Sequence, residues 1–277
     1  MKLKYLNYVN VQTIGILKFL QLLVLIVAFQ APIFSTPVSG EKKHIVFLIS
    51  EDVDNYEAHL TIPSYAKRIS ETYGYKTTVI LGKGDRTSFH FSGLDILEKT
   101  DLLVVFCRRV ALKKEQMKLI KDYLSQGKPL VGIRTANHAF SIREKDKINE
   151  GYEDWWGFVP EILGCENKGY GPKEFGTEVL LFPENNNHSI VQGVEPGNWR
   201  SKGTLYLVAP LLDQNAKIYL EGKFESEPSH PIAWTRTTDD NSHVFYTSLG
   251  HPNDFENKNF IKILDNGIKW ALGDLNK

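Results

Sequence analysis

The sequence predicts an α/β fold of three layers, with a mostly parallel central sheet, helices on both of its faces and extra strands in the C-terminal half. Two observations predict it. In the first half of the 277-residue chain, short apolar runs bounded by polar turns alternate with amphipathic helical patterns. Strands in such alternating chains form a parallel sheet, and the helices pack on its faces. The second half is rich in short β-prone segments and closes with an amphipathic helix.

Four mainly apolar runs in the first half are bounded by polar turns, which is typical of strands buried on both faces. These expected strands cover residues 44–50, 76–82, 101–107 and 129–133. Between them, apolar residues recur at helical spacing over residues 62–73 and 113–127, and Gly127 is a typical helix stop. We expect the connections between parallel strands to be right-handed.

The second half contains five β-prone segments before its last helix. They cover residues 174–182, 203–210, 216–222, 231–236 and 243–250. The last helix, expected over residues 257–273, carries its apolar residues on one face. No linker, repeat or low-complexity tract follows residue 40, so we expect one domain over residues 40–277.

The first 39 residues differ from the rest. Lys2, Lys4 and Lys18 precede an apolar run over Phe19–Phe29, and small residues and prolines follow. This order is typical of a secretory signal peptide, and the run is short for a membrane span. We expect export to the periplasm or the medium, with a mature chain that begins between about residues 36 and 41. An uncleaved membrane anchor is the alternative, and we expect no other contact with a membrane.

Charge and cysteine content exclude two classes of protein. Lys and Arg number 33, as do Asp and Glu, so the formal net charge is zero and nucleic acid is not an expected partner. Cys107 and Cys165 belong to no C-x-x-C pattern and are too few for a disulfide framework. Cys107 ends an apolar run, where a buried thiol is expected. The chain also lacks a G-x-S-x-G nucleophile motif and a Walker A loop.

In open parallel sheets, ligands bind at the carboxyl ends of the strands. Polar segments follow the expected strand ends at Ser50, Cys107, Ile133 and Gly250. We therefore expect four segments that are distant in the sequence to converge at one edge of the sheet and to form the site.

His251 and Asp254 follow the last strand. A histidine on such a turn can act as acid, base or metal ligand near neutral pH. The alternative is a structural histidine whose ring shapes the turn through backbone hydrogen bonds. Asp254 either orients His251 or caps the following turn.

Arg134 and His138 follow the fourth strand. The guanidinium is a rigid fork that can hold a carboxylate, a phosphate or sugar hydroxyls, and the alternative is an ion pair with Glu51 or Asp52. His138 lies near a helix start, where a neutral imidazole is favoured; it is either a ligand-binding residue or a packed helix residue.

Glu51, Asp52 and His59 belong to the first strand-to-helix loop and are candidates for binding a polar substrate. Solvated residues that flank a helix start are the alternative. A divalent metal is weakly supported, because no H-x-x-x-H or H-E-x-x-H pair occurs. Tyr170 belongs to a group of aromatic residues in the middle of the chain, and such rings pack well against the apolar faces of sugars.

Four stretches resemble a known family: DLLVVFCRRVALKKEQMKLIKDYLSQGKPLVGIRTANHAF, PIAWTR, HVFYTSLGHPNDF and FIKILDNGIKWALG. They resemble the ThuA-like family, named for trehalose utilisation, over roughly residues 44–273. The resemblance implies the class I glutamine amidotransferase-like fold, a flavodoxin-like sheet with extra strands. It also links the chain to the metabolism of trehalose, related glycosides or keto-sugars.

The resemblance implies that Arg134 stands at or beside the position of the cysteine nucleophile of true amidotransferases. His251 would match their catalytic histidine, although Asn253 replaces the following glutamate. Since glutaminase chemistry of this kind requires a thiolate, we expect none here. The resemblance also implies histidines in the loop that reads NKGYGPKEFG in this chain. This loop contains Tyr170 and no histidine, so a metal site is supported less still.

Two hypotheses follow for the function. The first is an exported enzyme that acts on a sugar derivative, in which His251 acts as acid or base and Asp254 orients it. The second is a non-catalytic sugar-binding or accessory protein. An acidic partner and an open face on His251 would favour the enzyme, whereas ring nitrogens tied to backbone groups would favour the binding protein.

Overall fold

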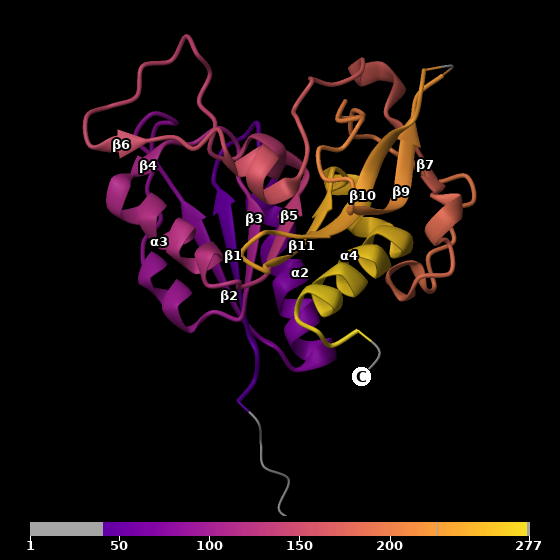
Figure 1. The fold of residues 1–277 in the computed structure, drawn as a ribbon, viewed down its shortest axis with the longest axis horizontal. Helices are drawn as coiled ribbons and strands as arrows, with labels where there is room; N and C mark the ends of the chain where they lie inside the picture. The colour runs from indigo at the N-terminus through magenta and orange to yellow at the C-terminus, as the bar shows by residue number, and fades with distance from the viewer. Residues whose placement is uncertain (1–40, 226, 276–277) are drawn as a thin grey trace, which may run out of the picture. The chain divides into compact units, whose positions relative to one another are not determined.

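A nine-stranded sheet in the order β2-β1-β3-β5-β11-β10-β9-β7-β8 forms the centre of the fold (Figure 1). The computed structural model describes residues 41–225 and 227–275, so the segment expected to direct export lies outside the described residues. The strands of this sheet are β1 (His44–Ser50), β2 (Lys76–Gly82), β3 (Leu102–Phe106), β5 (Leu130–Ile133), β7 (Thr177–Leu181), β8 (Arg200–Ser201), β9 (Lys217–Lys223), β10 (His230–Thr237) and β11 (His243–Thr247). A separate two-stranded sheet pairs β4 (Leu112–Lys113) with β6 (Tyr152–Glu153).

Five strands, β2-β1-β3-β5-β11, pair in parallel. Taken in chain order they have the 2-1-3-4-5 arrangement of a flavodoxin-like sheet. Every residue of β1, β3 and β5 is buried, as their apolar sequences predict. The expectation that β2 is buried on both faces is wrong, because β2 is an edge strand in which only Ile80 and Gly82 are buried. The predicted α/β class with a mostly parallel sheet is confirmed.

Two helical layers cover the sheet, and alternate residues of β1 pack against each. Ile45 and Phe47 belong to a buried cluster with residues of α2 (Ala58–Tyr73) and α4 (Lys258–Ala271). Val46 and Leu48 belong to a second cluster with residues of α3 (Lys114–Ser125). Because side chains alternate along a strand, one apolar run can fill both clusters. Each large apolar side chain buried in this way contributes about 1.5–3 kcal/mol.

Short helices and turns connect these elements. They are η1 (Leu94–Lys99), η2 (Arg134–His138), η3 (Phe158–Leu163), η4 (Lys173–Phe175), η5 (Pro183–Asn185), η6 (Ser189–Val191) and η7 (Pro252–Glu256). Residues from Lys42 onward form one unit. Among the helices of residues 41–225 and 227–275, none is long and apolar enough to cross a membrane.

The C-terminal half adds antiparallel strands, as expected, but one predicted strand is wrong. Residues 203–210 are irregular, and only Tyr206 makes an isolated bridge, to Tyr170. Their backbone instead bonds the loop that contains Tyr170, through Gly171 N to Leu205 O (2.9 Å) and Leu207 N to Gly169 O (3.0 Å). The sheet edge in this region is completed by β8.

The carboxyl ends of β1, β3, β5 and β11 lie at one edge of the sheet because these strands run parallel. The expected convergence of four distant segments is therefore confirmed. The turn after β5 is η2, and the turn after β11 leads into η7, so both carry candidate residues at this edge.

Candidate functional site

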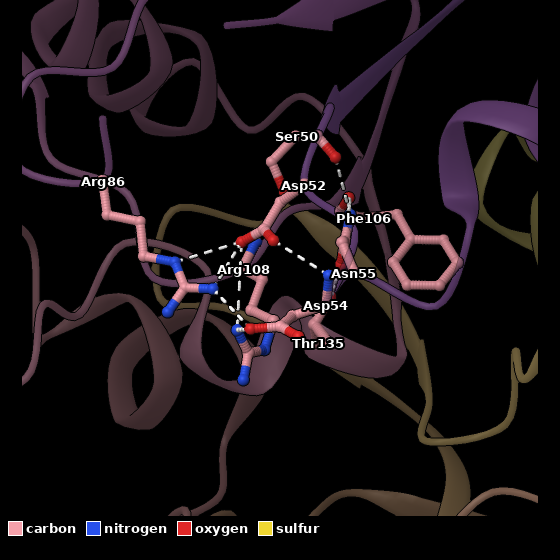
Figure 2. A network of polar contacts seen from close by, with 8 residues as sticks. All are labelled: Ser50, Asp52, Asp54, Asn55, Arg86, Phe106, Arg108 and Thr135. Carbon is pink, nitrogen blue, oxygen red and sulfur yellow. Dashed lines mark hydrogen bonds and ion pairs between the residues drawn. The ribbon is translucent and has the colours of Figure 1, made fainter. Parts of the chain in front are cut away.

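One buried amide joins three strand ends at this edge (Figure 2). Asn55 is fully buried, and its Nδ2 donates to the carbonyl oxygens of Ser50 (3.1 Å) and Phe106 (2.7 Å). Thr135 Oγ1 donates to Asn55 Oδ1 at 2.6 Å. The loop after β1 is thereby fixed to the ends of β1 and β3 and to the turn after β5.

Two carboxylates and two guanidiniums form a network on the same loop (Figure 2). Arg86 donates to Asp52 Oδ2 from Nε (3.0 Å) and Nη2 (2.7 Å), and from Nη2 to Asp54 Oδ2 (2.9 Å). Arg108 Nη1 donates to the same oxygen of Asp54 at 3.1 Å. The four charges balance, and Asp52, a candidate for binding substrate, is engaged in this network.

Arg134 lies beneath the site and not at its surface. Its side chain is 1% exposed, and Nη1 donates to the carbonyl oxygen of Ser248 at 2.6 Å. The guanidinium carbon lies 4.0 Å from the ring centroid of Tyr56 and 4.8 Å from that of Tyr206, within the range of cation–π contacts. The expected alternative, an ion pair with Glu51 or Asp52, is not formed, so Arg134 supports two tyrosines from below.

The turn after β11 fixes His251 through its backbone. Asp254 is buried, and its Oδ2 accepts hydrogen bonds from Gly250 N, His251 N and Ser201 Oγ, each at 2.9 Å. The ring Nδ1 of His251 accepts from the Asn253 N–H at 3.3 Å. Asp254 thus caps η7 and positions the backbone of His251, whereas the carboxylate makes no hydrogen bond to the imidazole.

Because Nδ1 accepts an N–H, the neutral ring of His251 carries its proton on Nε2. Nε2 has no hydrogen-bond partner among residues 41–225 and 227–275, so it is free to donate to a ligand. Burial and the positive charge of Arg134 lower the pKa of His251 below its ordinary value, against the opposing charge of Asp254. The ring is therefore held as a neutral hydrogen-bond donor.

A cavity of about 550 Å³ lies over these residues. Segments that follow β1, β3, β5 and β11 contribute to its wall, together with the loops around Tyr170 and Thr204. Its lining residues are Val53, Asp54, Tyr56, Glu57, Arg108, Arg109, Asn137, His138, Arg143, Asn167, Gly169, Tyr170, Lys173, Lys202, Gly203, Thr204, Tyr206, His251 and Pro252.

Three of the sequence-predicted residues line this cavity: His251, His138 and Tyr170. Tyr170 is 62% exposed, so one face of its ring is accessible at the rim. His138 is buried, and its Nδ1 lies 2.5 Å from Asn137 Oδ1. Burial and the nearby charges of Arg109 and other arginines lower the pKa of His138 well below its usual range.

The other five predicted residues lie outside the cavity lining: Arg134, Asp52 and Asp254, described above, and Glu51 and His59. Glu51 is exposed and pairs with Lys83 at 3.1 Å. His59 lies in the first turn of α2, and its buried Nδ1 has no hydrogen-bond partner in residues 41–225 and 227–275.

Sequence reasoning missed Tyr56, which lines the cavity beside His251. The two rings are in an edge arrangement with centroids 6.0 Å apart. Burial alone would raise the pKa of Tyr56, but the charge of Arg134 and hydrogen bonding to Arg134 and Thr204 outweigh it and lower the pKa. A tyrosine with a lowered pKa in a cavity is a candidate for proton transfer. No motif marks it in the sequence.

Backbone strain is concentrated at this site. Six non-glycine residues of the described chain have positive φ, and four of them line the cavity or lie directly below it: Tyr56, Glu57, Arg109 and Arg134. Such conformations cost of order 1–3 kcal/mol each and tend to cluster at functional sites.

Neither cysteine can serve as a nucleophile in this arrangement. Cys107 is fully buried, and its thiol donates to the Leu48 carbonyl oxygen at 3.2 Å. Burial raises the pKa of both thiols, that of Cys165 to about 12. Since the thiolate is the reactive form, the burial of both thiols disfavours thiol chemistry at neutral pH. Within the described residues, no cluster of three or more His, Cys, Asp or Glu side chains has the arrangement of a metal site.

The fold and the site define a class: an α/β protein of flavodoxin-like strand order, with a cavity at the carboxyl edge of its sheet and no accessible thiol. The chain belongs to the ThuA family, described as trehalose utilisation, whose sequence profile matches residues 46–271.

Solved structures share this fold. A ThuA-like protein from Bacteroides uniformis is 14% identical, with a TM-score of 0.59, over 83% of this chain and 91% of its own. A ThuA-like protein from Parabacteroides merdae is 16% identical, with a TM-score of 0.59, over 86% of this chain and 92% of its own. No curated protein matches the sequence.

Proposed function

We propose that the protein binds a sugar or sugar derivative, such as a glycoside or keto-sugar, in this cavity and acts on it without a cysteine nucleophile. Membership of the ThuA family supports a carbohydrate-related role. The cavity volume of about 550 Å³ is within the roughly 300–1,000 Å³ typical of small-molecule sites. The accessible ring of Tyr170 at the rim is suited to the apolar face of a sugar.

The observation that carries the proposal is the hydrogen bonding of the two ring nitrogens of His251. A backbone N–H occupies its Nδ1, and Nε2 has no hydrogen-bond partner within the described part of the chain, at a position that lines the cavity. A neutral imidazole can donate from Nε2 to a substrate oxygen on which negative charge develops. Such a donor is suited to a carbonyl or a departing glycosidic oxygen.

In this proposal Tyr56 transfers a proton to or from the substrate. Its hydroxyl is a stronger acid than that of an ordinary tyrosine because Arg134 lies against the ring. Its neighbour His251 is positioned to act on the same substrate. We therefore assign the donor role to His251 and the acid–base role to Tyr56.

One observation favours the second function, a non-catalytic sugar-binding protein. The ring of His251 has no carboxylate partner, because Asp254 bonds only backbone N–H groups and Ser201. A histidine that serves as a general base usually has such a partner to orient it.

One experiment distinguishes the enzyme from the binding protein. Purified protein is incubated with a panel of glycosides and their keto forms, with and without divalent metals, and products are identified by mass spectrometry. The enzyme proposal expects product formation that falls in His251→Gln and in Tyr56→Phe. Binding of a panel member by calorimetry, with no product in any condition, would establish the binding protein instead.

We also propose that the protein is exported. The basic and apolar order of residues 1–39 supports this, and the proposal rests on that segment alone.

A further inference from the structure

The cavity carries an excess of positive charge although the whole chain has none. Five cationic side chains line it, against two acidic ones. Lys and Arg equal Asp and Glu over the full chain, so this excess is local. The lining cations are Arg108, Arg109, Arg143, Lys173 and Lys202, and the lining acids are Asp54 and Glu57.

Pairing within the protein does not remove the excess. Asp54 and Arg108 belong to the balanced network with Asp52 and Arg86 (Figure 2). None of the other four lining cations forms an ion pair with a carboxylate of residues 41–225 and 227–275, and only Glu57 remains to oppose them. These four are Arg109, Arg143, Lys173 and Lys202.

Hydrogen bonds from both its backbone and its side chain fix Arg109 at the cavity. Its N–H donates to the His138 carbonyl oxygen at 3.0 Å, and Nη1 donates to the Ser141 carbonyl oxygen at 3.2 Å. Its φ of 52° is a strained conformation for a residue with a side chain. The guanidinium has five N–H groups, so most of its donors are left for a ligand.

An unsatisfied amide points to a ligand independently of charge. Asn137 lines the cavity, is 1% exposed, and its Nδ2 has no hydrogen-bond partner among the residues that the structure describes. A buried donor without a partner is destabilising, so such groups are rare unless something binds them. The oxygens of a carboxylate, phosphate or hydroxyl group would satisfy this donor.

Repulsion between the lining cations contributes to the lowered pKa values of Arg109 and His138. Burial and the charges of Arg143 and Arg108 lower the pKa of Arg109. Arg109 in turn contributes to the lowered pKa of His138. A bound anion would relieve both effects.

We propose that the natural ligand of the cavity is an anionic sugar, one whose carboxylate or phosphate group is held by Arg109 with Arg143 and Lys202 while Asn137 donates to it or to an adjacent hydroxyl. This inference rests on the proposed carbohydrate function and adds the charge of the substrate. Carboxylate and phosphate share the chemistry of several oxygens around one negative charge, and guanidinium forks recognise both.

Calorimetric titration tests the inference with five probes: glucose, trehalose, glucuronate, glucose 6-phosphate and inorganic phosphate. We expect at least one anionic sugar to bind about tenfold or more tightly than glucose. Its affinity should fall between about 20 mM and about 300 mM NaCl, whereas that of a neutral sugar should not. The two anionic sugars distinguish a carboxylate from a phosphate ligand.

Charge-removing variants locate the site. Arg109→Gln should weaken binding of the anionic sugar roughly tenfold, and Arg143→Gln or Lys202→Gln roughly threefold, with glucose unaffected. Arg200→Gln, which removes an exposed arginine outside the cavity lining, is the matched control and should bind as the unmodified protein does. Circular dichroism on the same samples confirms that Arg109→Gln is folded.

The outcomes separate this inference from the proposed function. Equal binding of glucose and both anionic sugars, unchanged in the three variants, overturns the anionic ligand and leaves the carbohydrate function standing. Binding of inorganic phosphate with no binding of any sugar supports the anion site and overturns the carbohydrate function. Binding of no probe at all overturns the anionic ligand.

Discussion

The guanidinium carbon of Arg134 lies 4.0 Å from the centroid of the Tyr56 ring. This contact stabilises the tyrosinate form, and hydrogen bonding at the same site lowers the pKa of Tyr56 further. Seven other described tyrosines, Tyr65, Tyr73, Tyr75, Tyr123, Tyr206, Tyr219 and Tyr246, have raised pKa values. Tyr56 is therefore expected to ionise before them.

The first prediction is that Tyr56→Phe removes the earliest phase of a tyrosinate titration followed by ultraviolet absorbance. Tyr219→Phe is the control, because the pKa of Tyr219 is raised by burial and its loss should leave that phase intact. The pKa of Tyr56 is lower in the folded state than in the unfolded state. The free energy of unfolding should therefore rise as pH increases toward about 10. An unchanged early phase in Tyr56→Phe would contradict the assignment.

The second prediction concerns the amide that joins three strand ends. Asn55→Ala should lower the free energy of unfolding by about 2–4 kcal/mol, because it leaves buried carbonyl oxygens and the Thr135 hydroxyl without their partner. Urea unfolding measures the change. Asn215→Ala, at an exposed position, should change stability by less than about 0.5 kcal/mol. A near-neutral Asn55→Ala would show that the loop after β1 is not fixed by this amide.

The third prediction compares possible reactive groups. Once a substrate is identified, His251→Ala should lower turnover roughly 100- to 1,000-fold, the loss typical of removing one donor to a developing negative charge. Cys107→Ser and Cys165→Ser should leave turnover largely intact, since both thiols are buried and protonated. Activity and melting temperature are measured on the same preparations. If His251→Ala melts early but turns over normally, the histidine is structural.

Arg134→Ala is a poor test of catalysis. The side chain is almost fully buried between two tyrosines, so its removal leaves a void and should lower stability together with activity. His251 is only partly buried, which makes its substitution easier to interpret.

The fourth prediction concerns acid sensitivity. Burial lowers the pKa of five histidines, His44, His138, His188, His230 and His251, below the ordinary value of 6.5. The unfolded chain then binds more protons than the folded one, so the free energy of unfolding should fall as pH drops below about 6.5. Chemical denaturation between pH 5 and 8, roughly the range in which histidine titrates, measures this.

His138 should contribute most to this loss, because its pKa is lowered well below the usual range. His138→Gln should therefore reduce the dependence of stability on pH. A profile that is flat below about pH 6.5 in the unmodified protein would contradict the buried neutral state of these rings.

The fifth prediction is that the protein recovered from the periplasm or the medium lacks about its first 35 to 40 residues. N-terminal sequencing by mass spectrometry provides the measurement. Recovery of a membrane-bound product that still begins at Met1 would show that the segment is an uncleaved anchor.

The sheet and the edge that carries the site could be predicted because they depend on local sequence patterns. Apolar runs mark buried strands, and parallel strands bring their carboxyl ends together. For this reason His251 and His138 could be placed at one edge from the sequence. Arg134 was placed at the same edge, but its burial beneath the tyrosines depends on packing that no local pattern records.

The remaining parts of the site depend on backbone conformations that are rare for their residue types. Left-handed φ values at Tyr56 and Arg109 place these side chains at the cavity, and propensities do not anticipate such values outside glycine, asparagine and aspartate. The segment around Tyr206 has the composition of a strand, yet it bonds a neighbouring loop. Tertiary contacts overrode its β propensity.

The strained positions also have a consequence for the evolution and engineering of this protein. Glycine adopts left-handed conformations without steric penalty, so Glu57→Gly or Arg109→Gly would relieve strain. Selection for thermal stability alone would therefore accumulate glycine around the cavity. Glu57 and Arg109 line the cavity, so thermostabilising libraries that aim to preserve ligand binding should leave both positions unchanged.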